Sequence, residues 1–236
     1  MRIANKSEIE DFKRKYCRND YARISMVNDF FVRVESFEEL PLKKYISSYA
    51  TGNRDIENAF IMFIVLDLEN QIQYLPVFSE SVGRKMLKAW NMPIPRKRSI
   101  FVKENNDTRG GNGGICGNTS NIDNVKMRNL ILFVRSLMIL HVKEPYPMNG
   151  ILKEFYEELE SNFDKKVEAY KIKSINTALG RFLQSSTNMK NENFLSLQDY
   201  IKFLEKNAGE RRLKNTNFDS LRKLMLVKYP NERIYF

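Results

Sequence analysis

The pattern of hydrophobic positions changes near residue 105. Before that point, apolar residues form short stretches rich in β-branched and aromatic side chains, which is typical of strands. After residue 121 they recur every three or four positions, which is typical of amphipathic helices. Five of the ten glycines lie in between. The pattern predicts an α+β protein, with a β-rich region at 1–104, a flexible Gly/Asn-rich loop at 105–121 and a helical region at 122–236.

Several stretches of the first region predict individual elements. Residues 21–34 alternate imperfectly and carry many aromatic and β-branched side chains, which favours a strand. Residues 36–49 are expected to form a short helix followed by a loop. Residues 59–68 and 71–78 are two apolar runs joined by a short polar turn, which predicts a β-hairpin. Pro76 indicates that the second strand lies at an edge or bulges there.

A helix and a further strand follow the hairpin. Ser79 is a suitable N-cap for a helix over 80–90, and Pro93 and Pro95 end it. Residues 97–103 are then expected to form a strand. Five-stranded OB barrels place a helix between their third and fourth strands in the same order, so the β-rich region is predicted to be OB-like.

The second region predicts helices throughout. The longest apolar run, 130–142, is interrupted by Arg135, Ser136 and His141. It is too short and too polar to cross a bilayer, so a buried helix without a transmembrane segment is expected. The predicted helices cover residues 122–141, 152–170, 194–206 and 218–228, and residues 172–183 are expected either to continue the second of these helices or to begin a new one.

The N-terminal residues and the two cysteines indicate an intracellular protein of the cytoplasm or nucleus. The first 16 residues contain no apolar segment of the kind that secretory signals need. Cys17 and Cys116 are far apart and match no disulfide or zinc-ligand spacing, which suits a reducing compartment. Richness in Lys, Asn, Ile, Phe and Tyr is typical of an AT-rich genome, such as that of a virus, a phage or a low-GC bacterium.

Positive charge is concentrated in one segment. The chain has 39 Lys and Arg residues against 29 Asp and Glu, and residues 81–103 contain seven basic residues and no acid. Concentrated like charges repel one another unless an anionic partner binds them, and each cation that contacts a phosphate releases a counterion. We therefore expect nucleic-acid binding. The predicted phosphate contacts are Arg84, Lys85, Lys88, Arg96, Lys97, Arg98 and Lys103.

Aromatic residues among these cations favour single-stranded DNA or RNA, because unpaired bases stack on aromatic rings. Tyr74 and Phe101 are the predicted stacking rings, with Trp90, Tyr45 and Tyr49 as further candidates. Trp90 and Phe101 are equally typical of a core. The strand–helix–strand order with a basic edge is similar to that of phage-type single-strand binding proteins. That similarity implies a sequence-tolerant binding protein without chemistry of its own.

Enzymatic chemistry has one candidate. Asp67 and Glu69 follow an apolar strand at i and i+2, so they point to one face and suit a divalent metal. The segment FIVLDLEN resembles the first metal motif of archaeo-eukaryotic primases and primase-polymerases. The family's second motif needs a histidine that this chain does not offer, and only Asp107 could supply its third. A polar hairpin turn explains the two acids as well. We therefore expect no catalytic residue, metal or cofactor, and keep a metal-dependent nucleotidyl or nuclease enzyme as an alternative.

Two other features of the sequence do not predict an active site or a nucleotide-binding loop. The single histidine, His141, cannot build a catalytic triad or a poly-His metal site alone. The glycines at 105–121 match neither a Walker loop nor a dinucleotide fingerprint.

Two further classes use the same basic surface. A viral nucleocapsid-type protein would assemble through its helices, and the acidic stretch at 151–170 is a candidate surface for self-assembly or a protein partner. A second basic cluster at 206–228 would either extend the binding surface or form a second contact. A scaffold on anionic membrane surfaces is the other class, because such lipids also attract basic patches.

Overall fold

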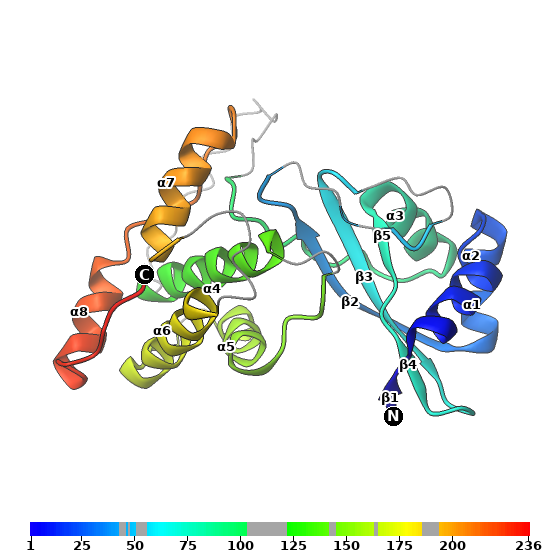
Figure 1. Cartoon of the computed structure of the whole chain (residues 1–236), viewed down its shortest axis with the longest axis horizontal. Helices are drawn as coiled ribbons and strands as arrows, with labels where there is room; N and C mark the ends of the chain where they lie inside the picture. Colours follow the sequence, from blue (N-terminus) through cyan, green and yellow to red (C-terminus); the bar gives the residue numbers. More distant parts are fainter. Residues whose placement is uncertain are drawn as a thin grey trace. The chain divides into compact units, whose positions relative to one another are not determined.

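The computed structural model describes residues 1–42, 46, 48–50, 56–102, 122–141, 145–162, 165–185 and 194–236. The chain divides into two compact units. The N-terminal unit comprises Met1–Ser99 with Val142–Pro147, and the C-terminal unit comprises Ile100–His141 with Met148–Phe236. The sheet belongs to the first unit, and the second is built from helices, so the predicted α+β class is confirmed (Figure 1). The predicted loop at 105–121 lies outside the described residues.

The central strand of the sheet is β3 (Ala59–Asp67), which is buried over most of its length. One edge of β3 pairs antiparallel with β2 (Phe31–Glu39). Its other edge pairs antiparallel with both β4 (Ile72–Tyr74) and β5 (Val77–Ser79). The short strand β1 (Arg2–Ile3) extends the sheet by pairing parallel with β4. The hairpin predicted at 59–78 is therefore present, and its second arm is divided into two strands around Pro76.

The predicted OB-like barrel is not confirmed. Among the described residues the strand order is β1-β4-β3-β2, with β5 beside β3, and the end strands β1 and β2 do not pair. The β1–β4 pair is parallel, so the sheet is mixed. An OB fold is a five-stranded Greek-key barrel, and this order does not close into one.

The strand predicted at 21–34 is wrong in its first part, where the chain forms the helix α2 (Asp20–Asp29). Asn19 caps this helix, because its side-chain oxygen accepts a hydrogen bond from the backbone N–H of Ala22 at 2.8 Å. Ala22 and Met26 are buried four positions apart. The cap and this spacing outweigh the strand propensity of the neighbouring aromatic and β-branched residues.

The short helix predicted at the start of 36–49 is also wrong, because β2 continues to Glu39. Its register with β3 runs from Phe31 opposite Leu66 to Glu39 opposite Ala59, with a bulge between Val34 and Ser36. Pairing with the buried β3 strand satisfies the backbone polar groups of β2 and overrides local propensity.

Three helices of the N-terminal unit share one face of the sheet. They are α1 (Lys6–Tyr16), α2 and α3 (Glu80–Ala89). Alternate residues of β3 point to this face, including Phe63, and join a core with Phe12 of α1, Met26 of α2 and Met86 of α3. Helix α1 was not predicted. Its signal was the capping box of Asn5 and Glu8, in which each side chain accepts a hydrogen bond from the other residue's backbone N–H.

The predicted helix over 80–90 is confirmed as α3, and Ser79 is its N-cap residue. Gly83 lies against β3: a Cβ atom at this position would come within 2.8 Å of the Cβ of Ile61. Because Gly83 has no side chain, α3 can approach the sheet closely. Trp90 follows the helix and packs edge-on against Phe63, with ring centroids 5.5 Å apart.

The strand predicted at 97–103 is divided between the two units. The Arg98 N–H donates to the Phe37 carbonyl at 2.8 Å, and the Glu39 N–H donates to the Arg98 carbonyl at 2.9 Å, in the N-terminal unit. In the C-terminal unit, Phe101 forms an antiparallel bridge with Leu213. The described part of this segment therefore forms two short pairings with different partners instead of one strand.

The C-terminal unit is organised around α4 (Ile122–Leu140), which is buried on most sides and contacts each of the other helices of the unit. The helices predicted around 194–206 and 218–228 are present, but the single helix predicted at 152–170 is wrong, since α5 ends at Ser161 and α6 begins at Ala169. None of the helices in the described part of the chain is long and apolar enough to cross a membrane. The surrounding helices are α5 (Gly150–Ser161), α6 (Ala169–Gln184), α7 (Leu197–Asn207) and α8 (Asp219–Lys228).

The close contact at Gly83 gives a stability prediction. Gly83→Ala gains about 1 kcal/mol of helix propensity but forces a methyl group against Ile61, and such overpacking costs about 1–3 kcal/mol. We expect the free energy of unfolding to fall by up to about 2 kcal/mol in urea denaturation followed by circular dichroism. Lys88→Ala, on the exposed side of the same helix, is the control and should stay near the wild type. A Gly83→Ala variant that is more stable than the wild type would contradict the packing.

Candidate nucleic-acid interface

Two of the predicted phosphate-binding cations are engaged inside the N-terminal unit. Arg84 Nε and Lys97 Nζ each donate to a different oxygen of the Glu80 carboxylate, both at 2.9 Å. Both cations also lie over the ring of Phe37, 5.0 Å from its centroid. Burial works to raise the pKa of Glu80, but the hydrogen bonds from Lys97 and Arg84 outweigh it and lower this pKa. Arg84 and Lys97 therefore bind the segment after α3 to the start of that helix.

Three other cations point outward. Lys85 and Lys88 are exposed on α3, and Arg96 is exposed in the segment that follows it. Lys85 lies 3.7 Å from Asp20, but both side chains are more than half exposed, and such pairs hold weakly. Lys88 and Arg96 have no ion-pair partner in the described part of the chain. Arg98 is half-buried, and Lys103 lies outside the described residues.

The two rings predicted to stack bases are core residues. Tyr74 is buried and stacks on Phe12, with centroids 4.3 Å apart and planes 18° from parallel. Phe101 is buried in the other unit, where the guanidinium carbon of Arg211 lies 4.1 Å from its ring centroid. Stacking by these two rings stays a prediction that their burial does not favour. Tyr45 lies outside the described residues.

An exposed aromatic groove lies between α2 and the end of α3. It encloses about 480 Å³ and is open to solvent. Tyr21 stands at its rim with 83% of its surface exposed, and the indole N–H of Trp90 donates to the Ile24 carbonyl at 2.8 Å, which fixes the ring. The lining residues are Tyr21, Ile24, Ser25, Val27, Asn28, Ala89, Trp90 and Met92.

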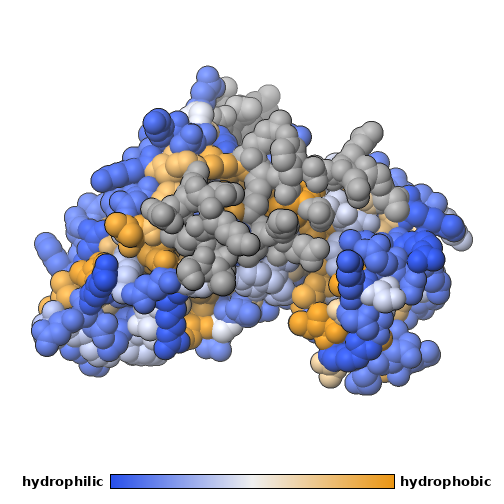
Figure 2. All heavy atoms as spheres, viewed as in Figure 1, coloured by the Kyte–Doolittle hydropathy of each residue, from blue (hydrophilic) through white to orange (hydrophobic). Residues whose placement is uncertain are grey.

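Sequence reasoning missed this groove because residues 21–34 were assigned the period of a strand. The available signal was the helical spacing of Tyr21, Ile24 and Asn28 after the capping residue Asn19. On the face seen in Figure 2, hydrophilic side chains surround several hydrophobic patches. Tyr21 is the most exposed aromatic side chain in the described part of the chain, and it lines the groove together with Trp90.

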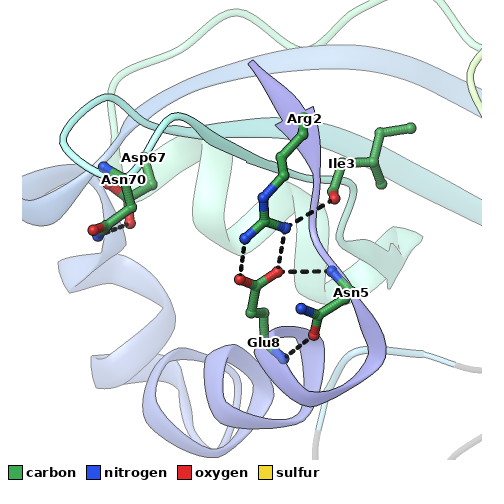
Figure 3. Close-up of polar contacts among 6 residues, drawn as sticks. All are labelled: Arg2, Ile3, Asn5, Glu8, Asp67 and Asn70. Carbon is green, nitrogen blue, oxygen red and sulfur yellow. Dashed lines mark hydrogen bonds and ion pairs between the residues drawn. The ribbon is translucent and has the colours of Figure 1, made fainter.

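The other side of α2 borders a hollow whose charged lining residues are mostly acidic. This hollow encloses about 580 Å³ between α1, α2 and the β3–β4 turn. Arg2 forms a two-bonded ion pair with Glu8, which lowers the pKa of that carboxyl to about 2 (Figure 3). Lys15 is the basic residue in the lining, which also holds the acids Glu8, Asp11, Asp29, Asp67 and Glu69.

Asp67 acts as a turn residue in the structure. Its two carboxylate oxygens accept hydrogen bonds from the backbone N–H and side-chain amide of Asn70, at 2.9 and 2.8 Å (Figure 3). The side-chain bond from Asn70 is the main cause of the lowered pKa of Asp67. No group of three or more His, Cys, Asp and Glu side chains within the described ranges is placed to hold a metal ion. The observed role of Asp67 is that of the polar hairpin turn.

The remaining sequence candidates lie in the C-terminal unit. His141 directly follows the last residue of α4, and its ring makes edge-on contacts with the rings of Phe182 and Phe194. In the predicted acidic surface at 151–170, Glu158 contacts Lys165 and Lys171, and Glu160 contacts Arg128. Much of the acidic charge is therefore balanced inside this unit.

Comparisons with known protein families, with curated proteins and with solved structures each find no match. Only the chemistry of this chain therefore bears on its function.

The Glu80 contacts predict a pH-dependent effect of Glu80→Gln. Wild type should be more stable than this variant at pH 7 by about 1 kcal/mol, a value kept low because the side chains are partly exposed. The folded-state pKa of Glu80 is lowered, so its ion-pair stabilisation is present above the ordinary glutamate pKa and is lost as the pH falls through the lowered value. Urea denaturation of both proteins between pH 7 and pH 3 measures this difference. Glu69→Gln, at an exposed acid, is the control, and a Glu80→Gln difference that does not change with pH would contradict the assignment.

Proposed function

We propose that this protein is a non-catalytic, sequence-tolerant nucleic-acid-binding protein that favours single strands. The binding surface lies on the N-terminal unit, over α3 and the segment that follows it. The observation that carries the proposal is the set of exposed cations Lys85, Lys88 and Arg96 on α3 and the segment after it, with an exposed aromatic groove at the end of this helix. A cationic track next to exposed rings is the combination that single-strand binding proteins use.

The cations of the basic segment have two different roles in this proposal. Arg84 and Lys97 hold the fold through Glu80 and Phe37, so they contribute to the local positive field and not as direct phosphate contacts. Lys97 contacts the first residue of α3, so the segment after Trp90 returns toward the start of the helix. Arg96 immediately precedes Lys97 and is therefore placed toward that end, whereas Lys88 lies near the other end. The outward cations thus extend along the helix, as a phosphate backbone requires.

Salt dependence tests the proposal. We expect single-stranded oligonucleotides to bind with an affinity that falls steeply as salt rises, because bound phosphates release counterions. Replacing Lys85, Lys88 and Arg96 together by Ala should make the slope of log K against log[salt] shallower by up to about 2, at about 0.7 for each lost contact to a single strand. Fluorescence anisotropy with labelled DNA and RNA at several salt concentrations measures both slopes.

The control removes the same charge from other exposed positions, with Lys6, Lys166 and Lys202 replaced by Ala. This variant should keep a slope within about 0.5 of the wild type. Equal slopes for the two triple variants would show that the bound strand does not use α3. A wild-type affinity that does not respond to salt would reject nucleic-acid binding by this surface.

A further inference from the structure

The described lining of the groove between α2 and α3 carries no cation, so the groove suits an uncharged part of a ligand better than it suits a phosphate. We infer that it receives the unpaired bases of the bound strand, with Tyr21 as the principal stacking ring. This inference rests on the proposed nucleic-acid binding and specifies which part of the nucleic acid each side of the surface contacts.

Tyr21 is suited to stacking by its position. It lies in the first turn of α2, a helix that is anchored by the Asn19 cap and by the buried residues Ala22 and Met26. Its side chain is 83% exposed, so its ring faces are open to a ligand, whereas Tyr74 is covered by Phe12. A rigidly held backbone with an exposed ring loses little conformational entropy when a base stacks on it.

The rest of the groove supplies a fixed apolar wall with polar groups beside it. The Trp90 ring is held by its hydrogen bond to the Ile24 carbonyl and by its edge-on contact with Phe63. Asn28 is exposed, and its side-chain amide can donate to and accept from the edges of any base. Apolar faces with few oriented polar groups bind bases without selecting one sequence.

Electrostatics orient the strand across α2. The acidic hollow borders the α1 side of this helix and shares Asn28 with the groove, whereas Lys85 and Lys88 lie on the α3 side. Phosphates are attracted to the cations and repelled by the acids, so the backbone lies over α3 and the bases turn toward Tyr21.

The same charges disfavour an anionic membrane as the occupant of the groove. Asp20 and Asp29 begin and end α2, and both are exposed. Inserting the apolar residues of this helix into a bilayer would bring both carboxylates against anionic headgroups. A single strand that follows Lys85 passes one of these carboxylates, Asp20, which already pairs with that lysine.

The test separates base stacking from phosphate binding. Tyr21→Ala should weaken binding of a mixed-sequence single strand by about 5- to 100-fold at constant salt and leave the salt slope unchanged. Tyr21→Phe, which keeps the ring, should remain within about threefold of the wild type. An abasic strand of equal length should bind wild type and Tyr21→Ala equally. Trp90 is the single tryptophan, so its fluorescence should respond to the strand with bases and much less to the abasic strand.

The possible failures are distinguishable. If Tyr21→Ala binds like the wild type while the Lys85, Lys88 and Arg96 variant still binds with a shallower slope, stacking in the groove is wrong and the proposed function stands. If wild type binds no strand in a salt-dependent way, both proposals fail. Stronger binding to vesicles containing phosphatidylserine than to any strand would replace the nucleic acid by a lipid surface and overturn the inference.

Discussion

The structure of the N-terminal unit depends on the burial of β3. This strand is apolar along most of its length, and its buried backbone groups need hydrogen-bond partners at both edges. β2 supplies them on one side, and β4 and β5 supply them on the other. The face of β3 that packs against the helices admits α3 closely, because Gly83 has no side chain to meet Ile61. The position of α3 in turn places Glu80 at one end and Trp90 at the other.

The placement of α3 divides a uniform run of cations into two groups. Glu80 lies where Arg84 reaches it from one turn further along the helix and Lys97 reaches it from the returning segment. Both cations then cover Phe37, whose ring favours a positive charge above its face. Lys85 and Lys88 are exposed to solvent on the same helix, with Lys88 one turn beyond Arg84 and therefore farther from Glu80. The proposed function therefore uses the cations that Glu80 and Phe37 do not engage.

Helix α2 separates two surfaces of different character. On one side lies an acid-lined hollow, and on the other an apolar groove next to outward cations. A net positive charge of +10 alone would attract a polyanion without orienting it. In the proposed binding mode, the acids beside α2 would give this direction, because they repel phosphates from one side of the groove. In that mode, this orientation, more than the total charge, directs phosphates to α3 and bases to Tyr21.

Local patterns in the sequence determined the fold class, the hairpin of β3 with β4 and β5, helix α3 and most of the helices after residue 121. These elements depend on neighbours in the chain, on periodicity and on capping residues, which a sequence displays directly. Contacts between distant residues decided the rest. Whether Tyr74 is buried against Phe12, and whether Tyr21 is left exposed, depends on packing between helices and sheet. The pairing of Lys97 with Glu80 likewise needs the chain to turn back after α3, which charge counting along the sequence does not reveal.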